Sequence, residues 1–338
     1  MSVRCGRSSI FGEAAFLRSF ASCSRTILRK EGSSNMKNVK RIALVLALFL
    51  IAVLGLGCAP QGAAGSAAVT DMLGREVKLS APAKKIVAVN PADCEILYLI
   101  GAGDTLVGRG EYCNYPEEVA SVPAVQSGSE TNVEQIIALE PQLVIMSTMA
   151  QSSEQVETLE NAGIPVYVSD AATIDQVYQN IEHIGQLTGK TTEAEAAVED
   201  MKKAFASISE KAGGAEGKTI YFEVSPLEYG LWTAGTGTFM DEIATMLGLQ
   251  NAFNDVQGWG EVSEEQVLAR DPVYIVTVGM YLGEGPTPVE EILSRTVWQS
   301  LKAIKSSNVV SVDSDEISRP GPRLADAAQA ICDFVYGE

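Results

Sequence analysis

From Lys84 onward, short runs of apolar, mostly β-branched residues alternate with segments of helical periodicity. In the first half the apolar runs are IVAVN, TLVGR, QLVIM and PVYV, and the helical segments are ADCEILYLIGA, VEQIIAL, EQVETLENAG and IDQVYQNIEHIGQLTG. Continuous apolar runs of this length are typical of strands buried on both faces, and their alternation with helices predicts a parallel sheet. The pattern therefore predicts an α/β lobe over residues 81–188.

A second set of strands and helices follows one long helix. Residues 191–212 contain no Gly or Pro, are rich in helix-forming residues and end at Gly213 and Gly214, so we expect a linking helix within 189–214. The apolar runs KTIYFEV, VYIVTV and NVVSV then alternate with FMDEIATMLG, SEEQVLA, PVEEILS and RLADAAQAICDFVY. A second α/β lobe is therefore predicted over residues 215–338.

The ends of the predicted strands indicate where a ligand binds. In α/β lobes of this kind the ligand lies outside the carboxyl ends of the parallel strands. Asn90, the 109–116 loop and the 147–151 loop all follow predicted strands. We expect them on one rim.

Residues 36–58 have the pattern of a lipoprotein export signal. A basic head with Lys37 and Lys40 precedes an apolar run that is too short for a comfortable bilayer span, and Gly57 precedes Cys58. Cys58 is therefore the predicted lipidation site and membrane anchor, although Gly55 stands where a lipidation signal usually has Leu, and a plain peptidase nearby is the alternative.

Residues 1–57 are excluded from the predicted fold. Residues 1–35 are interpreted as a start codon placed too early, with a serine- and arginine-rich transit peptide as the alternative. The small-residue segment after Cys58 has no apolar period, so residues 59–80 are predicted to form a flexible tether.

Acidic residues outnumber basic ones, most strongly after the signal. The sequence holds 25 Lys and Arg against 43 Asp and Glu, and nine of the basic residues but only two of the acidic ones precede Ala59. Residues 59–338 therefore carry 16 basic and 41 acidic side chains, a net charge of −25. Such a surface repels phosphate backbones, which excludes unspecific nucleic-acid binding.

Three cysteines follow Cys58, so at most one disulfide forms within the remaining chain. Cys94 and Cys113 are the candidate pair. Three free thiols, with Cys332 as the third, fit the sequence equally well because the sequence does not define the redox state of the compartment.

Two segments resemble each other, and each holds a glutamate. NVEQIIALEPQLVIM at 132–146 and EVSEEQVLARDPVYIV at 261–276 both run from a polar cap through Glu and a short apolar helix to Pro and a buried strand. Glu134 and Glu265 could simply satisfy free N–H groups in a first helical turn. Their matched placement in both lobes instead favours two docking points for a two-fold symmetric partner.

The run from about Lys84 to Tyr336 resembles the substrate-binding proteins of ABC importers for cobalamin, ferric siderophores and haem, and most of all the cobalamin-binding branch. The resemblance rests on GRGEYCNYPEEV at 108–119, NVEQIIALEPQLVI at 132–145 and VSEEQVLARDP at 262–272. It implies two Rossmann-like lobes joined by one long helix, with the chelate in the cleft between them. It further implies that Glu134 and Glu265 dock on arginines of a permease dimer that works with an ATPase.

The resemblance also suggests ligand contacts. Tyr112 and Trp259 match a cleft tyrosine and a cleft tryptophan of the family, and Phe239 is a looser match. Aromatic faces suit a broad, partly apolar chelate.

Two further tryptophans of the cobalamin binders fall at Gly128 and Ser147, and this departure keeps ferric siderophores as the alternative ligand. Arg109, Arg319 and Arg323 could face an anionic ferric chelate, although Arg319 and Arg323 also suit a loop and a helix start. Tyr115 is interpreted as a packed loop residue.

Other motifs in the sequence do not indicate a functional site. TGKTT at 188–192 lacks the first glycine of a phosphate-binding loop, and Gly235 and Gly237 make only part of a dinucleotide fingerprint. His183, the single histidine, lies in a helical pattern and is expected to be structural, which disfavours a zinc site and haem, although Tyr112 could ligate iron. A surface-attached α/β hydrolase lacks both a nucleophile elbow and a usable histidine.

The sequence therefore predicts a non-enzymatic, monomeric, lipid-anchored receptor outside the cytoplasm. We expect it to carry a metal chelate as cargo, without a resident cofactor, and to deliver it to an ABC permease.

Overall fold

The computed structural model describes residues 65–148, 151–215, 217–279 and 285–337. The described residues belong to one compact unit, Ala64–Glu338. The predicted leader 1–35, the export signal 36–58 and its Cys58 lie outside the described residues. Among the described helices, none combines the length and the apolar character that crossing a membrane requires.

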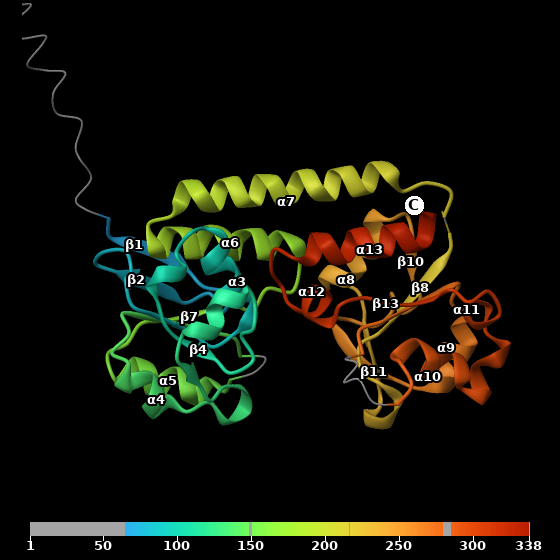
Figure 1. The fold of residues 1–338 in the computed structure, drawn as a ribbon, viewed down its shortest axis with the longest axis horizontal. Coiled ribbons are helices and arrows are strands. Elements are labelled where there is room, and N and C mark those ends of the chain that lie inside the picture. Colours follow the sequence, from blue (N-terminus) through green and yellow to red (C-terminus); the bar gives the residue numbers. More distant parts are fainter. Residues whose placement is uncertain (1–64, 149–150, 216, 280–284, 338) are drawn as a thin grey trace, which may run out of the picture. The chain divides into compact units, whose positions relative to one another are not determined.

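The first lobe is built on a five-stranded sheet in the order β5-β4-β3-β6-β7, with every pair parallel (Figure 1). Alternate residues of its strands enter two separate apolar clusters: Ile86 and Ile145 face one, Val87 and Val144 the other. Helices therefore cover both faces of the sheet, which explains the continuous apolar runs. The strands are β3 (Ile86–Ala88), β4 (Leu106–Gly110), β5 (Ala124–Val125), β6 (Leu143–Met146) and β7 (Val166–Val168).

The helices of the first lobe lie at the expected places. Ser152 and Thr173 begin α5 and α6 with complete capping boxes, in which side chain and backbone bond reciprocally. The α-helices are α3 (Pro91–Leu99), α4 (Val133–Ala138), α5 (Ser153–Asn161) and α6 (Ile174–Thr188), with short 3₁₀ turns η2 (Gly103–Thr105), η3 (Glu117–Ser121) and η4 (Gly128–Glu130).

A hairpin precedes the first lobe, which corrects the predicted tether. Strands β1 (Ala67–Thr70) and β2 (Glu76–Leu79) pair antiparallel, and Val69, Val77 and Leu79 are buried in the main core. Asp71 closes the turn between the strands by accepting hydrogen bonds from the backbone and side chain of Arg75. A tether over 59–80 is therefore wrong for residues 67–79, because their period-two apolar positions bury one face of the hairpin.

The second lobe repeats the parallel design with four strands in the order β10-β8-β12-β13. A separate antiparallel pair, β9 with β11, lies beside this sheet. The strands are β8 (Thr219–Glu223), β9 (Leu231–Ala234), β10 (Gln250–Asn251), β11 (Trp259–Val262), β12 (Tyr274–Thr277) and β13 (Val309–Ser311). The helices are α8 (Phe239–Met246), α9 (Glu264–Arg270), α10 (Pro288–Ser294), α11 (Lys302–Lys305), α12 (Ser314–Ser318) and α13 (Leu324–Tyr336), with 3₁₀ turns η5 (Leu227–Tyr229) and η6 (Thr296–Ser300).

One long helix, α7 (Thr191–Lys211), connects the lobes. It packs on α6 of the first lobe and on α13 of the second (Figure 1). Its buried side chains recur every three or four residues and form one apolar stripe: Ala194, Val198, Met201, Phe205 and Ile208. The predicted fold class, two parallel-sheet lobes joined by a single long helix, is confirmed.

Candidate functional site

The carboxyl ends of the first lobe's strands bring together a polar rim. Asn90 follows β3 and lies 3.4 Å from the Ser169 hydroxyl, which follows β7. Asp170 accepts hydrogen bonds from the hydroxyl and the backbone of the 147–148 segment after β6, at 2.7 Å from the Ser147 hydroxyl and 2.9 Å from the Thr148 amide. Of the predicted rim, Asn90 and residues 147–148 therefore lie beside the end of β7, whereas 149–150 lie outside the described residues.

Tyr112 extends from the loop after β4 and is 65% exposed. Arg109, at the end of β4, holds this loop: its guanidinium donates to the carbonyl oxygens of Gly110 and Cys113 at 3.1 Å and of Val122 at 3.2 Å. Arg109 therefore orients the backbone around Tyr112. That guanidinium is engaged by carbonyl groups in the structure.

The second lobe presents two tryptophans on one face of the β9–β11 pair. Trp259 lies opposite Ala234 and Trp232 opposite Glu261. Paired residues of antiparallel strands share a face, as do residues two apart, so both indoles project to the same side. Trp232 is 41% exposed, and Trp259 is half-buried. Trp259 also packs against the main core, so Trp232 is the more exposed of the two indoles.

Phe239, the third predicted ligand contact, lies inside the core and is 2% exposed. Its ring centroid is 5.5 Å from that of Trp259 at an interplanar angle of 61°. Edge-to-face packing of this kind fixes the orientation of the outer ring. Phe239 thus supports Trp259 from behind.

A buried ionic cluster joins the two lobes on one side. The Glu95 carboxylate on α3, 1% exposed as a side chain, accepts hydrogen bonds from Arg319 at 2.8 Å and from Arg323 at 2.7 and 2.9 Å. Arg319 also donates to the Asn114 side chain at 2.8 Å, and Asn114 donates to Asp315 at 2.9 Å. The loop that carries Tyr112 is therefore bonded to the second lobe.

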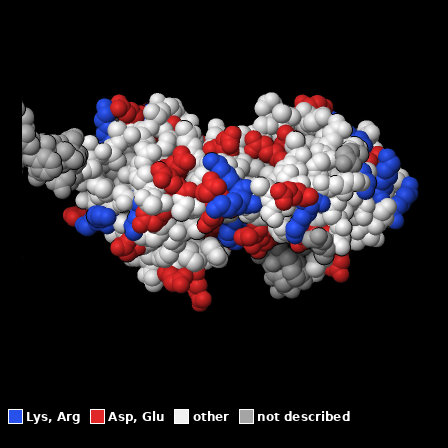
Figure 2. All heavy atoms as spheres, turned by 90° about the horizontal axis from the view of Figure 1, so that it is seen from above, with Lys and Arg blue, Asp and Glu red and all other residues white. Residues whose placement is uncertain are grey.

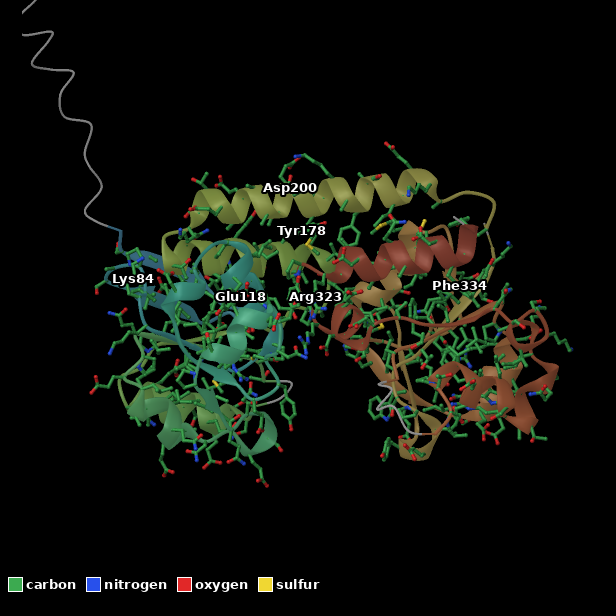
Figure 3. All side chains as sticks on the ribbon, in the orientation of Figure 1. Lys84, Glu118, Tyr178, Asp200, Arg323 and Phe334 are labelled. Carbon is green, nitrogen blue, oxygen red and sulfur yellow. The ribbon has the colours of Figure 1, made fainter. Side chains whose placement is uncertain are left out.

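A cavity of about 560 Å³ lies beside this cluster, lined by α3, by the start of α13 and by the loop near Tyr115. The Arg323 guanidinium stacks 4.4 Å from the centre of the Tyr115 ring, and Glu118 faces the same space from the first lobe (Figure 3). Neither Trp232 nor Trp259 lines this cavity. Arg319 and Arg323 lie at the end of α12 and the start of α13, as the alternative interpretation predicted.

Backbone contacts join the lobes at a second place. The Phe239 amide donates to the Ala172 carbonyl at 2.7 Å, and the Ile174 amide donates to the Glu242 carboxylate at 2.6 Å. Both bonds connect the start of α6 with the start of α8. The lobes are thus held by the ionic cluster, by these bonds and by α7.

Glu134 and Glu265 occupy equivalent positions in the two lobes. Each is exposed in the first turn of a short helix, α4 or α9, two residues after a side-chain cap, Asn132 or Ser263. A hydrogen bond with Ser263 lowers the pKa of Glu265. Both helices lie on the side of their lobe away from α7 (Figure 1). The matched geometry leaves both carboxylates accessible.

His183 and Asp93 make hydrogen bonds inside the first lobe. His183 bonds the Tyr167 hydroxyl at 3.1 Å, and burial lowers its pKa. Asp93 is fully buried and accepts from Ser169 at 2.6 Å and Asn180 at 3.1 Å, and burial raises its pKa to about 7. Within the described ranges no cluster of three or more His, Cys, Asp or Glu could hold a metal ion.

Sequence reasoning missed Trp232 and Glu95. The signal for Trp232 is the strand alternation of LWTA, in which Leu231 and Thr233 are buried and the indole is not. Glu95 is separated from its partners by more than 200 residues, at 224 from Arg319, and no local pattern marks such a pair.

Comparisons with known proteins identify similar sequences and structures. The family model for periplasmic binding proteins matches residues 86–316. An uncharacterized ABC transporter substrate-binding lipoprotein of Bacillus subtilis is 34% identical over 314 residues, covering 88% of this chain and 98% of that protein. The vitamin B12-binding protein of Salmonella typhimurium is 30% identical over 257 residues, covering 75% and 90%. A solved structure described as a possible iron-binding (periplasmic solute-binding) protein of Staphylococcus epidermidis is similar at a TM-score of 0.65 and 28% identity, covering 75% and 99%.

Proposed function

The chain belongs to the periplasmic binding protein family, and from this premise we propose that it captures a corrinoid and delivers it to the permease of an ABC importer. The family consists of extracytoplasmic solute-binding proteins, not of enzymes. A substrate-binding protein of an ABC transporter works with a permease, an ATPase and a small-molecule ligand. We propose the corrinoid as the ligand and the two glutamates, Glu134 and Glu265, as the contacts with the permease.

The observation that supports a corrinoid as the ligand is the pair of tryptophans, Trp232 and Trp259, on one face of the β9–β11 pair. A corrin is a broad, largely apolar disc, and burial against aromatic faces is the main source of affinity for such a ligand. Two tryptophans that the cobalamin binders have in the first lobe are absent from this chain. Trp232, on β9 of the second lobe, supplies a second indole instead. In the first lobe, the exposed ring of Tyr112 would contact the same ligand.

The arginines favour the same ligand over an anionic chelate. Arg109 is bonded to carbonyl oxygens, and Arg319 and Arg323 are bonded to Glu95. A ferric siderophore that used these guanidinium groups would have to replace buried charge-assisted hydrogen bonds, which is costly. Seen from above, on the side that carries α7, Lys and Arg are intermixed with Asp and Glu (Figure 2).

A ferric siderophore remains the second candidate, supported by similarity to the Staphylococcus epidermidis structure, which is described as a possible iron-binding protein. Its capture would need the lobes to separate, since Arg319 and Arg323 become available only when their bonds to Glu95 break. Direct competition between a corrinoid and a ferric siderophore would distinguish the two ligands.

Delivery uses Cys58, Glu134 and Glu265. A lipid on Cys58 would keep the receptor at the membrane surface, and the two exposed glutamates would engage paired arginines of a two-fold symmetric permease. Lobe closure on the ligand is small, because α7 packs on both lobes along its buried stripe.

Calorimetric titration with cyanocobalamin, cobinamide and a panel of ferric siderophores tests the ligand. We expect one-to-one corrinoid binding that falls at least tenfold in Trp232→Ala and in Trp259→Ala. Tyr178→Ala is the matched control, because this tyrosine lies on α6 under Lys202 and away from the β9–β11 face (Figure 3). Binding of a siderophore alone would replace the corrinoid, and binding of neither ligand would refute the chelate receptor.

Transport in whole cells tests docking. Glu134→Ala and Glu265→Ala should bind ligand as well as the parent protein and yet lose uptake. Glu154→Ala is the control, since Glu154 also lies in the first turn of a capped helix, α5. Uptake that survives in the double variant Glu134→Ala and Glu265→Ala would exclude these residues as docking points.

A further inference from the structure

We infer that Cys94 and Cys113 form a reversible disulfide that ties the loop of Tyr112 to helix α3. Both thiols are directed at one acceptor: the Cys94 sulfur lies 3.5 Å and the Cys113 sulfur 3.9 Å from the carbonyl oxygen of Ala88. Two sulfur atoms that share one acceptor oxygen at these distances are neighbours.

The two cysteines come from different elements of the first lobe. Cys94 belongs to the first turns of α3 and is completely buried, whereas Cys113 follows the exposed Tyr112 in the loop after β4. Both are free thiols in the structure. Cys332, in contrast, lies on α13 with its sulfur 3.9 Å from the Ile208 carbonyl of α7, so it does not compete for either partner.

The reaction is thiol–disulfide exchange with an external disulfide, such as oxidised glutathione or a protein oxidant. The Cys113 thiolate attacks one sulfur of that disulfide, which forms a mixed disulfide and releases one thiolate. The Cys94 thiolate then attacks the Cys113 sulfur and releases the second. The two protons lost by the cysteines go to the two released thiolates, so the protein is oxidised by two electrons and the external disulfide is reduced.

Cys113 is the thiol that the oxidant meets first. It is 2% exposed, but its neighbours Tyr112 and Asn114 are exposed and lie on a loop, while Cys94 lies within a helix under the sheet. The adjacent Cys113 side chain and burial raise the pKa of the Cys94 thiol well above its usual range, so Cys94 reacts as the resolving thiol once the mixed disulfide has formed. Disulfides persist outside the cytoplasm, where this family works.

Closing the bond restrains the binding loop. Arg109 and Arg319 hold the loop by hydrogen bonds to its carbonyl groups and to Asn114, and these bonds can open reversibly. A covalent link from Cys113 to α3 cannot open in this way. Oxidation therefore reduces local opening of the segment that carries Tyr112.

Thiol mapping of the full-length protein, extracted from membranes in detergent, tests the pair. The protein is equilibrated with excess oxidised glutathione or with dithiothreitol, alkylated under denaturing conditions, digested and analysed by mass spectrometry. We expect the oxidised sample to yield the Cys94 and Cys113 peptides linked and the Cys332 peptide alkylated, and the reduced sample to yield all three alkylated. Alkylation of Cys94 and Cys113 in both samples overturns the inference.

Hydrogen exchange of the same two samples is the second measurement. Amides of residues 109–116 should exchange at least threefold more slowly after oxidation, while α9 in the other lobe stays unchanged. Cys332→Ser is the matched control and should keep both effects, and Cys113→Ser should lose both. If Cys113→Ser does not fold, the comparison of oxidised with reduced parent protein still tests whether the disulfide restrains the loop. Equal exchange of residues 109–116 in the two samples would refute this restraint.

Discussion

Replacing Glu95 by alanine tests how strongly the ionic cluster holds the two lobes together. The substitution removes the carboxylate that accepts three hydrogen bonds, at 2.7 to 2.9 Å, from Arg319 and Arg323. The arginine side chains are only 12% and 14% exposed, so they cannot regain full hydration in the folded protein. Both lobes contribute to the cluster, and the loss falls on the contact between them.

The magnitude follows from burial. Removing one partner of a buried ion pair costs about 3–5 kcal/mol, because the remaining charge is left uncompensated. Truncation of an exposed carboxylate costs about 0–1 kcal/mol. Glu118→Ala is therefore the matched control, since Glu118 is exposed and lines the same cavity. Glu95→Gln, which keeps an acceptor oxygen and loses the charge, should lie between the two.

Urea unfolding followed by two probes measures the effect. All three tryptophans of the sequence, Trp232, Trp259 and Trp298, lie in the second lobe, so tryptophan fluorescence follows that lobe while far-ultraviolet circular dichroism follows both. Glu95→Ala should lower the free energy of unfolding by several kcal/mol and separate the two transitions. Equal midpoints for Glu95→Ala and Glu118→Ala would refute the reasoning.

Three further predictions concern the aromatic face, a buried acid and a buried ion pair. Trp259→Phe should retain more corrinoid affinity than Trp259→Ala in calorimetry, because a ring still packs on the ligand, and equal loss in both would show that stacking is not the source of affinity. Burial raises the pKa of Asp93 from 3.8 to about 7, so its contribution to stability is fully present below about pH 4 and is lost as the pH rises through 7. Asp93→Asn should remove this loss, which urea midpoints at about pH 5 and pH 8 would detect, and an unchanged slope would contradict it. Arg295→Ala leaves Glu223 buried and unpaired and should cost about 3–5 kcal/mol, whereas Arg270→Ala, at a pair with an exposed partner, should cost under about 1 kcal/mol in thermal unfolding. Similar losses for both variants would be inconsistent with this difference.

The sequence predicts the two parallel sheets well because their strands are buried on both faces. Each of β3, β6 and β12 is a continuous apolar run, and burial on both faces is what such a run requires. The same reasoning identifies Asn90 and Tyr112 at strand ends, because the carboxyl edge follows from parallel topology alone. The matched caps before Glu134 and Glu265 are equally local signals.

Features that depend on distant partners could not be predicted. The hairpin at 67–79 has short strands with few large side chains, so its segment resembles a tether until Val69 and Leu79 find the core. The placement of Phe239 depends on the rotation of α8 against Trp259, which periodicity does not define. Pairing of β9 with β11 spans a whole helix and decides that Trp232 and Trp259 share a face.

The β9–β11 pair would also affect the entropy of the proposed binding. Aromatic side chains have only two rotatable torsions, and strand pairing has already ordered the backbone beneath Trp232 and Trp259 during folding. The edge of Phe239 further limits the rotamers of Trp259. A ligand that meets this surface therefore immobilises little that was free, whereas ordering a flexible side chain costs about 0.5–1.5 kcal/mol each. For the ligand site that we propose, the second lobe would thus be the preorganised half, and most of the conformational entropy of capture would be lost in the first lobe, at the loop of Tyr112.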